Sequence, residues 1–306
     1  MTNESPCGAR HDGRVLSVMA ALVLAAGCAG RGPGRVATTP APTASPASTA
    51  TARPTEHENL NAVLWVQTAV EYEASARQAY AAARAALASA LADPSWSAAI
   101  EQRGAGAGLP PAVVLDLDET VLDNAVFQAR LIETGAAYSE AVWRGWVEER
   151  HATAIPGALE FVREAEARGV TVFYVTNREA VSEAATRENL DRLGFPLGPP
   201  ARDTVLCRGE RPDWAGSDKS SRRAAVAREY RILQLVGDDL GDFLPQARGL
   251  PEQRRERAAP YGGWWGTRWI VVPNPMYGSW ERAVTDEAPG LPGDSAGRKR
   301  ARLRLR

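Results

Sequence analysis

The chain has 306 residues, which is long enough for one large domain or two small ones. Its 36 Lys and Arg residues nearly balance its 37 Asp and Glu residues, so the formal net charge is only −1. A chain without excess positive charge lacks the potential that attracts a nucleic acid polymer, and we expect no such partner.

Residues 1–27 have the pattern of a secretory signal peptide, with two arginines before an apolar run that is short for a membrane span. The sequence Leu-Ala-Ala-Gly then precedes Cys28 and resembles a bacterial lipobox, although Ala25 stands where a large aliphatic residue is usual. A lipobox implies an exported lipoprotein that is anchored to a membrane through lipidated Cys28. Because Ala29 is not the aspartate that signals inner-membrane retention, the outer membrane or the cell surface is favoured. An ordinary signal peptide cleaved nearby is the alternative.

Composition predicts the organisation of the mature chain. Residues 28–58 are rich in Ala, Thr, Pro and Ser, so we expect a lipid anchor followed by a disordered tether. Apolar residues at helical spacing predict an N-terminal helix over 59–92, with Asn59 as its N-cap. The main domain is expected to span 59–290. The basic segment 291–306 is predicted to be a tail, either near anionic lipid or frayed in solvent.

The segment 113–118 carries the strongest chemical pattern. Its apolar run ends in Asp116 and Asp118, as in a buried parallel strand that brings acids to the carboxyl edge of a sheet. Alternation along the strand places both side chains on one side, where they repel unless a cation lies between them or one is protonated. Both conditions suit phosphoryl transfer, in which one aspartate attacks phosphorus, the other transfers a proton, and Mg²⁺ offsets the phosphate charge. For an isolated Asp-x-Asp pair, an acidic turn would be the better explanation.

Further apolar runs alternate with helical segments along the chain. The runs cover 170–175, 204–206, 232–236 and 269–272. This alternation predicts an α/β fold with a doubly wound parallel sheet. A mostly helical insert over about 124–150 follows the first strand, where a cap over the site would be inserted.

Polar residues follow the later strands in an order that matches this chemistry. Thr176 and Asn177 offer a hydroxyl and nearby N–H groups to phosphate oxygens, and Lys219 at a helix start adds positive charge. A later strand end carries three acids, of which one or two can complete a magnesium site: Asp238, Asp239 and Asp242. Each residue alone has an ordinary structural explanation, but all of them in this order form a specific pattern.

At these residues the chain resembles the haloacid dehalogenase (HAD) superfamily in its phosphatase form, because Asp118 is present together with Thr120. More closely, it is similar to the bacterial class C acid phosphatases, the lipoprotein acid phosphatase and 5′-nucleotidase family, from residues 60–65 through 273–281. The resemblance implies a HAD-like Rossmannoid core with a mainly helical cap insert and an N-terminal helix.

The resemblance also implies roles for the acids. Asp116 would be the nucleophile and a magnesium ligand. Asp118 would act first as general acid and then as base, with its backbone carbonyl on the metal. Asp238 would be the third protein ligand of magnesium, and Asp242 and Asp239 would stand behind these ligands.

For the substrate, the resemblance implies phosphate binding by Thr176 and Lys219 with help from Asn177. Aromatic side chains of this family hold a nucleobase or an aryl group, and the candidates here are Trp143, Trp146 and Tyr277. Packing within the core or the cap is the alternative for these three.

Two residues depart from the pattern of the family. Phe127 stands where a tyrosine is usual, which we expect to alter the edge of the pocket. Asp239 replaces a neutral polar residue and adds negative charge beside the metal.

Together these inferences predict a magnesium-dependent acid phosphomonoesterase that hydrolyses nucleoside monophosphates and other phosphate monoesters through an aspartyl-phosphate. An acidic working range follows if Asp118 must carry a proton to the leaving group. Two alternatives remain open. One is a narrow phosphatase or phosphotransferase for another metabolite, and the other is a surface lipoprotein that acts mainly as a ligand-binding module.

Overall fold

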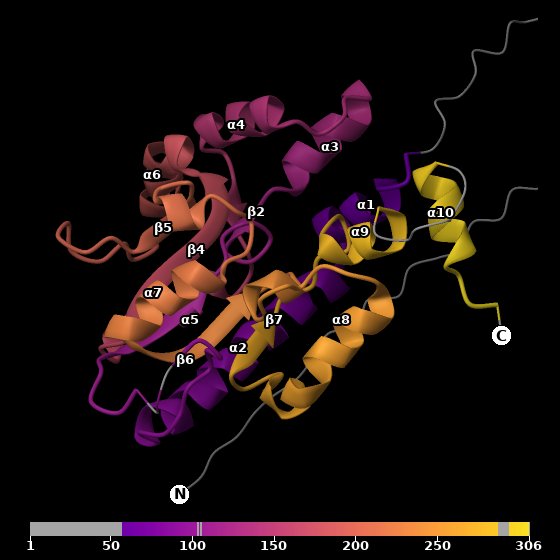
Figure 1. Cartoon of the computed structure of the whole chain (residues 1–306). Coiled ribbons are helices and arrows are strands. Elements are labelled where there is room, and N and C mark those ends of the chain that lie inside the picture. Colours follow the sequence, from indigo (N-terminus) through magenta and orange to yellow (C-terminus); the bar gives the residue numbers. More distant parts are fainter. Residues whose placement is uncertain (1–56, 103, 105, 287–293, 306) are drawn as a thin grey trace, which may run out of the picture. The chain divides into compact units, whose positions relative to one another are not determined.

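The computed structural model in Figure 1 describes residues 57–102, 104, 106–286 and 294–305. The predicted signal peptide, Cys28 and the tether up to residue 56 lie outside these described residues. Within the described ranges, every helix is too short or too polar to cross a bilayer.

A five-stranded sheet organises the domain, and its strand order is β5-β4-β1-β6-β7. All four strand pairings are parallel, as expected. The strands are β1 (Pro111–Leu115), β4 (Thr171–Glu179), β5 (Val205–Arg208), β6 (Arg231–Gly237) and β7 (Trp269–Val271). Because the central strand β1 pairs with β4 and β6, the residues that follow it reach the middle of the carboxyl edge.

Side-chain alternation along the strands gives the sheet two apolar faces. Val113 and Leu115 belong to one core, and Val114 belongs to the other. Helices cover both faces, which confirms the doubly wound α/β architecture. The helices that follow strands or lie against them are α5 (Ala158–Ala167), η1 (Ala180–Ser182), α6 (Glu183–Leu193), η2 (Pro212–Trp214), α7 (Ser220–Glu229), η3 (Leu240–Asp242), α8 (Pro251–Ala258) and η4 (Ala259–Trp264).

The predicted N-terminal helix is divided into α1 (Leu60–Thr68) and α2 (Val70–Ala92). Ala69 between them is extended, with ψ of 127°. The division lets α1 pack on the cap helix α3 (Ala125–Thr134), while α2 follows the sheet and α5. Asn59 occupies the N-cap position, but its side chain makes no capping bond and donates instead to Gln128 Oε1 at 3.4 Å. Tertiary contacts therefore override the helical pattern of the sequence at this point.

The cap consists of α3 and α4 (Glu140–Glu149), which agrees with the helical insert predicted over about 124–150. A small antiparallel sheet, which the sequence did not predict, joins the cap to the core. It pairs β2 (Leu122–Asp123) with β3 (Thr153–Ala154).

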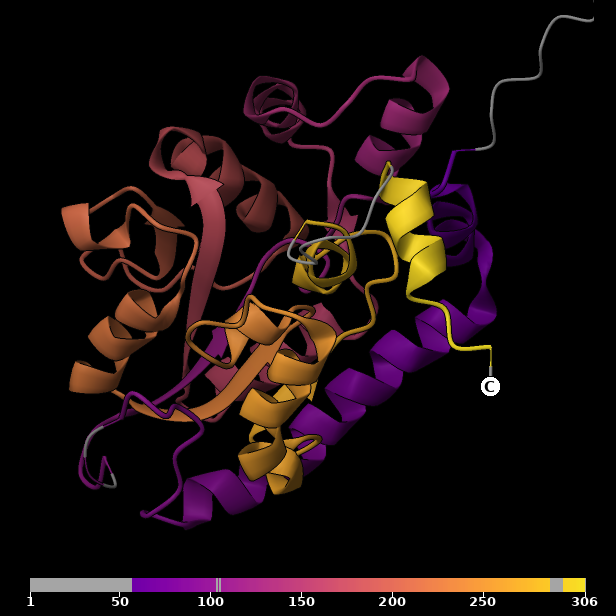
Figure 2. The same ribbon diagram turned by 45° about the vertical axis from the view of Figure 1, so that its right-hand side comes forward.

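The last described part of the chain contains α9 (Ser279–Thr285) and α10 (Ser295–Ala301). The segment predicted as a basic tail is therefore helical in part. Figure 2 shows α10, in yellow, beside α9 and α1. Lys299 of α10 pairs with Glu58 at 2.6 Å and with Glu281 of α9 at 2.7 Å.

Candidate active site

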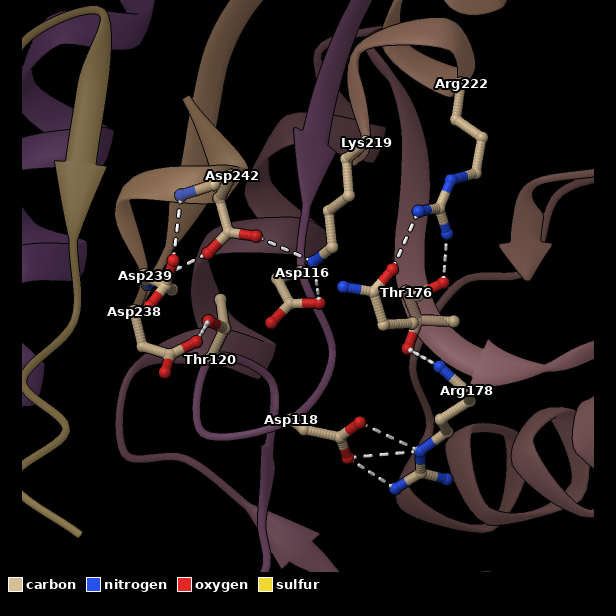
Figure 3. Close-up of polar contacts among 12 residues, drawn as sticks. Asp116, Asp118, Thr120, Thr176, Arg178, Lys219, Arg222, Asp238, Asp239 and Asp242 are labelled. Atoms are coloured by element: carbon tan, nitrogen blue, oxygen red, sulfur yellow. Dashed lines mark hydrogen bonds and ion pairs between the residues drawn. The ribbon is translucent and has the colours of Figure 1, made fainter. Parts of the chain in front are cut away.

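The acids and the lysine predicted from the sequence meet at the carboxyl edge of the sheet (Figure 3). Asp116 directly follows β1, and its backbone N–H donates to the Val236 carbonyl at 2.9 Å. A cavity of about 1000 Å³ opens above this edge and reaches the cap on one side. The predicted residues that line it are Asp116, Asp118, Asn177, Lys219, Asp238, Asp239, Asp242, Trp143 and Tyr277.

Lys219 joins two of these acids from its place just before α7. Its Nζ donates to Oδ1 of Asp116 and, at 2.7 Å, to Oδ1 of Asp242. Burial lowers the pKa of Lys219, but the two carboxylates outweigh it, and the pKa is raised overall. The ammonium group therefore stays charged beside Asp116.

Three carboxylates form a candidate metal centre. Asp116, Asp238 and Asp242 each offer an oxygen, and these oxygens lie within 4.8 Å of one another. Burial, together with the neighbouring acids, raises the pKa of Asp116 to about 7 and that of Asp238 well above its ordinary value. A divalent cation with a preference for oxygen ligands would relieve this repulsion, so the donor set fits magnesium. Asp242 is one of these three candidates, but its two oxygens also accept from Lys219 Nζ and, at 2.9 Å, from the Asp239 N–H. Its predicted place behind the metal ligands stays a prediction.

Asp118 has a partner that the sequence analysis did not identify. Arg178 donates to Asp118 Oδ1 from Nη2 at 2.7 Å, and its Nε lies 3.1 Å and 3.2 Å from the two carboxylate oxygens (Figure 3). Arg178 is 2% exposed, and its Nη1 donates to Thr186. Asn124 also donates to Asp118 Oδ1, at 3.0 Å. The one signal in the sequence was that Arg178 follows Thr176 by two residues at the end of a buried strand.

The predicted phosphate-binding residues are held by buried arginines. The Thr176 hydroxyl accepts the backbone N–H of Arg178 at 3.1 Å, which leaves the hydroxyl proton to donate elsewhere. Arg222 donates to the Thr176 carbonyl and, at 2.7 Å, to Oδ1 of Asn177. Because Arg222 takes the amide oxygen of Asn177, it turns that side chain so that its NH₂ group can meet an anion. Thr176 itself is fully buried beside the cavity.

The carboxylate of Asp239 does not point to the metal centre. It accepts the Gly241 N–H at 2.9 Å, the Ser279 N–H at 2.6 Å and the Ser279 hydroxyl at 2.7 Å. The charge expected beside the metal is thus used to cap η3 and the start of α9. Its neighbour Asp238 turns the other way and accepts from Asn274 at 2.8 Å and from Thr120 at 3.2 Å.

Of the three predicted pocket aromatics, Trp143 and Tyr277 line the cavity and Trp146 does not. Trp146 is 3% exposed, and its Nε1 donates to Oδ1 of Asn124 at 2.8 Å. Since Asn124 in turn bonds Asp118, the indole supports the site from within the cap. The Trp143 ring lies on the cavity side, with the Arg178 guanidinium 5.6 Å from its centroid.

Phe127, like Asp239, has a different consequence from the one expected of a departure from the family pattern. Phe127 is buried and packs on Trp143 with ring centroids 5.0 Å apart. It therefore lies inside the cap and does not form the edge of the cavity. Two further aromatic residues that the sequence analysis did not select, Tyr138 and Trp280, line the cavity instead.

Comparison with known families agrees with this arrangement. A sequence model of the HAD superfamily, subfamily IIIB (acid phosphatase), matches residues 36–280. The structure of the class C acid phosphatase from Bacillus anthracis is similar, with a TM-score of 0.68 and 32% sequence identity, over 80% of this chain and 96% of that chain. A crystal structure of the same protein with tungstate bound gives the same values.

Curated relatives are more distant or match over shorter segments. The stem 31 kDa glycoprotein of Glycine max is 26% identical over 167 residues, which are 54% of this chain and 58% of that protein. Glycerol-3-phosphate phosphatase of Homo sapiens is 44% identical over 62 residues, which are 20% of this chain and 17% of that protein. The chain thus spans less than two thirds of the length of these curated relatives.

Proposed function

The chain belongs to the HAD superfamily, subfamily IIIB, the acid phosphatases, and we propose that it hydrolyses nucleoside monophosphates with magnesium as cofactor and an aspartyl-phosphate on Asp116 as intermediate. The observation that carries this proposal is the position of Asp116. One of its oxygens is held by Lys219, its carboxylate lies within the acid cluster, and Asp118 lines the same cavity.

The first half of the reaction is assigned to Asp116 and Asp118. Lys219 holds Oδ1 of Asp116, and we assign the attack on phosphorus to Oδ2. A bond forms between Oδ2 and phosphorus while the bond between phosphorus and the ester oxygen breaks. Asp118 gives its proton to the departing alcohol and becomes the carboxylate.

In the second half, water attacks the phosphorus atom of phospho-Asp116. Asp118, now a carboxylate, takes a proton from that water as the bond between Asp116 and phosphorus breaks. Inorganic phosphate leaves, and both aspartates return to their starting states. Arg178 and Asn124 orient the Asp118 carboxylate that receives this proton.

The phosphoryl oxygens need positive charge and hydrogen-bond donors. We assign these roles to Asn177 and Lys219, which line the cavity, and to the hydroxyl of Thr176, which is buried beside it. Asp116, Asp238 and the backbone carbonyl of Asp118 would hold the magnesium ion, with Asp242 as a further candidate beside them. When bound, it neutralises part of the phosphate charge.

The alcohol part of the substrate occupies the rest of the cavity. A volume of about 1000 Å³ is sufficient for a nucleoside, and Trp143 and Tyr277 offer aromatic faces on which a base can stack. The nucleotide preference therefore depends on these two side chains, whereas the phosphoryl chemistry does not.

The proposed location is outside the cytoplasm. The support is the sequence pattern before Cys28, which predicts an exported lipoprotein at the outer membrane or the cell surface. We expect the natural protein to incorporate radiolabelled fatty acid and the Cys28→Ser variant to incorporate none. Incorporation that does not depend on Cys28 would contradict the anchor.

The first test is phosphate release by purified protein without the leader. Nucleoside monophosphates, sugar phosphates and an aryl phosphate are compared at acidic and neutral pH, with magnesium and with a chelator. We expect hydrolysis that favours nucleotides, is fastest at acidic pH and stops with the chelator. Mass spectrometry of acid-quenched protein should find phosphate on Asp116. Undiminished hydrolysis in the chelator, or phosphate on another residue, would overturn the mechanism.

A further inference from the structure

The helix α10 lies at the outer side of the substrate cavity, although it comes from the far end of the chain. Ser295 and Lys299 line the same cavity as Asp116. The space above the nucleophile therefore extends from the carboxyl edge of the sheet to this helix. The cap lines another side of the cavity through Leu131, Tyr138 and Trp143.

Lys299 in α10 makes ion pairs with two neighbouring segments of the chain. Lys299 Nζ lies 2.6 Å from Glu58, just before α1, and 2.7 Å from Glu281 in α9. Glu58 is also within 3.5 Å of the Ser295 hydroxyl. Lys299 thus joins α10 to α9 and to the segment before α1, and Glu58, Glu281 and Lys299 all line the cavity.

Helix α10, which forms the outer wall of the cavity, lies beyond the sequence region that the family model matches. The family match ends at residue 280, before both Glu281 and α10. The groups that we assign to the chemistry all lie within the matched region, whereas Lys299 and Ser295 of α10 lie beyond it. The contacts of α10 bear on the shape of the space for the alcohol part of the substrate and not on the reacting atoms.

We propose that α10 limits the size of the substrate, so that the protein hydrolyses phosphate monoesters of small molecules and discriminates against phosphate groups on polypeptides. This inference rests on the proposed phosphatase function. A polypeptide substrate must leave the cavity on both sides of the phosphorylated residue, whereas a small alcohol fits within about 1000 Å³. The ion pairs that hold α10 are partly exposed, so a change of charge should release it.

The test compares two substrates with the same leaving group. One is free O-phosphotyrosine, and the other is a peptide of about a dozen residues with the same phosphotyrosine at its centre, too large for a pocket of this class. Since both release a tyrosine phenolate, the ratio of their kcat/KM values reports size. Lys299→Glu places a third acid between Glu58 and Glu281. We expect this variant to raise the ratio of kcat/KM for the peptide to kcat/KM for the amino acid about tenfold. The kcat/KM for the amino acid itself should stay within about twofold of the natural value.

Two further variants show whether the ion pairs are responsible. The triple change Glu58→Lys, Glu281→Lys and Lys299→Glu exchanges the charges, and we expect it to restore the natural ratio. The matched control is Arg77→Glu on α2. Like Lys299, Arg77 lies near two acids, at 2.9 Å from Glu73 and 4.0 Å from Glu160, but these residues do not line the cavity. We expect this control to leave the ratio unchanged.

The possible outcomes distinguish a failure of the proposed size limit from a failure of the proposed phosphatase function. Hydrolysis of the amino acid with a ratio unchanged by Lys299→Glu would overturn the wall and leave the phosphatase intact. A ratio that rises equally in Arg77→Glu would also overturn it, because general destabilisation would then explain the change. Failure of the natural protein to hydrolyse free O-phosphotyrosine while it hydrolyses a nucleoside monophosphate would overturn the size limit, because both are small molecules. Failure on the nucleotide as well would overturn the proposed function, and this inference with it.

Discussion

The floor of the cavity, formed by the carboxyl edge of the sheet, and its outer wall, formed by α10, both contain ion pairs. The charged side chains differ in how far they are exposed to solvent. On the floor, the side chains of Lys219 and Arg178 are 6% and 1% exposed. At the wall, the side chains of Lys299 and Glu58 are 29% and 40% exposed. Loss of one partner from a buried pair leaves an uncompensated charge in a poor solvent, whereas water replaces a lost partner at an exposed one.

The difference suggests how the two regions can change. On the floor each buried charge has several partners, so we expect a substitution there to lower activity or stability. The wall is held by contacts that water can replace, so it can be altered without loss of the fold. We therefore expect substitutions on the floor to affect the chemistry and substitutions at the wall to affect the size of the substrate.

The largest effect is expected from Asp116→Asn. Asparagine keeps the shape of the side chain but removes the nucleophile, so we expect kcat to fall by at least about a thousandfold. Circular dichroism should show that the fold is unchanged. The matched control is Asp239→Asn, three residues from Asp242 but directed to Ser279, for which we expect kcat within about threefold of the natural value. A large loss in the control would mean that Asp239 also takes part in the chemistry.

A smaller loss is expected from Arg178→Lys, which keeps the positive charge and removes the paired donors on Asp118. We expect kcat/KM to fall about a hundredfold and the free energy of unfolding to fall by about 2 kcal/mol. Urea denaturation and steady-state kinetics measure the two effects. Arg187→Lys, at a pair with Glu183 outside the cavity, is the control. Equal losses in both variants would show that Arg178 has no special role.

Metal binding should depend on pH through the acid cluster. Burial raises the pKa of Asp116 to about 7, above its ordinary value of 3.8. At a pH between these two pKa values, Asp116 holds a proton in the folded metal-free protein but not in the unfolded chain. The free energy of unfolding of the metal-free protein should therefore fall as pH rises through this range. Magnesium competes with this proton for Asp116, so the rise in Tm that it causes should grow with pH over the same range. Fast hydrolysis at acidic pH is therefore expected only with enough magnesium to keep Asp116 deprotonated.

Scanning calorimetry with magnesium and with a chelator measures this difference. Asp238→Asn removes one acid of the cluster and should weaken both the metal effect and its dependence on pH. A magnesium effect on Tm that is the same at acidic and neutral pH would contradict the proposed metal centre.

The smallest effect on turnover is expected at the aromatic part of the cavity. Trp143→Ala should raise KM for a nucleoside monophosphate about tenfold and leave kcat nearly unchanged, because it removes a stacking surface and no reacting group. Trp146→Phe should instead lower the free energy of unfolding by about 1 kcal/mol, since it removes the bond to Asn124. If Trp146→Phe raised KM as much as Trp143→Ala, the buried position of Trp146 would not explain its role.

Much of the fold could be predicted because its signals are local. The apolar run before Asp116 and the alternation of strands with helices were sufficient for a parallel sheet, and the order of polar strand ends was sufficient for most of the site. Parallel strands bring their carboxyl ends to one edge, so residues far apart in the sequence could be grouped without a structure. The division of the first helix at Ala69 was missed because contacts of α1 with α3 outweigh helix propensity there.

The direction of individual side chains could not be predicted. Asp239 and Asp238 are neighbours, yet one caps α9 and the other joins the acid cluster. Trp143 and Trp146 lie three residues apart on α4, yet only Trp143 lines the cavity. In both pairs the outcome depends on a partner elsewhere in the chain, Ser279 for Asp239 and Asn124 for Trp146.

The sequence by itself determined the family, the sheet and the residues at its carboxyl edge, because strand formation and residue order depend on short-range patterns. The tertiary structure decided which of those residues meet. It paired Arg178 with Asp118, brought Asp242 beside Asp116 through Lys219, and fastened α10 to the mouth of the cavity through Lys299. These pairings join residues that are distant in the chain, and only the packing of the whole domain fixes their distances and burial.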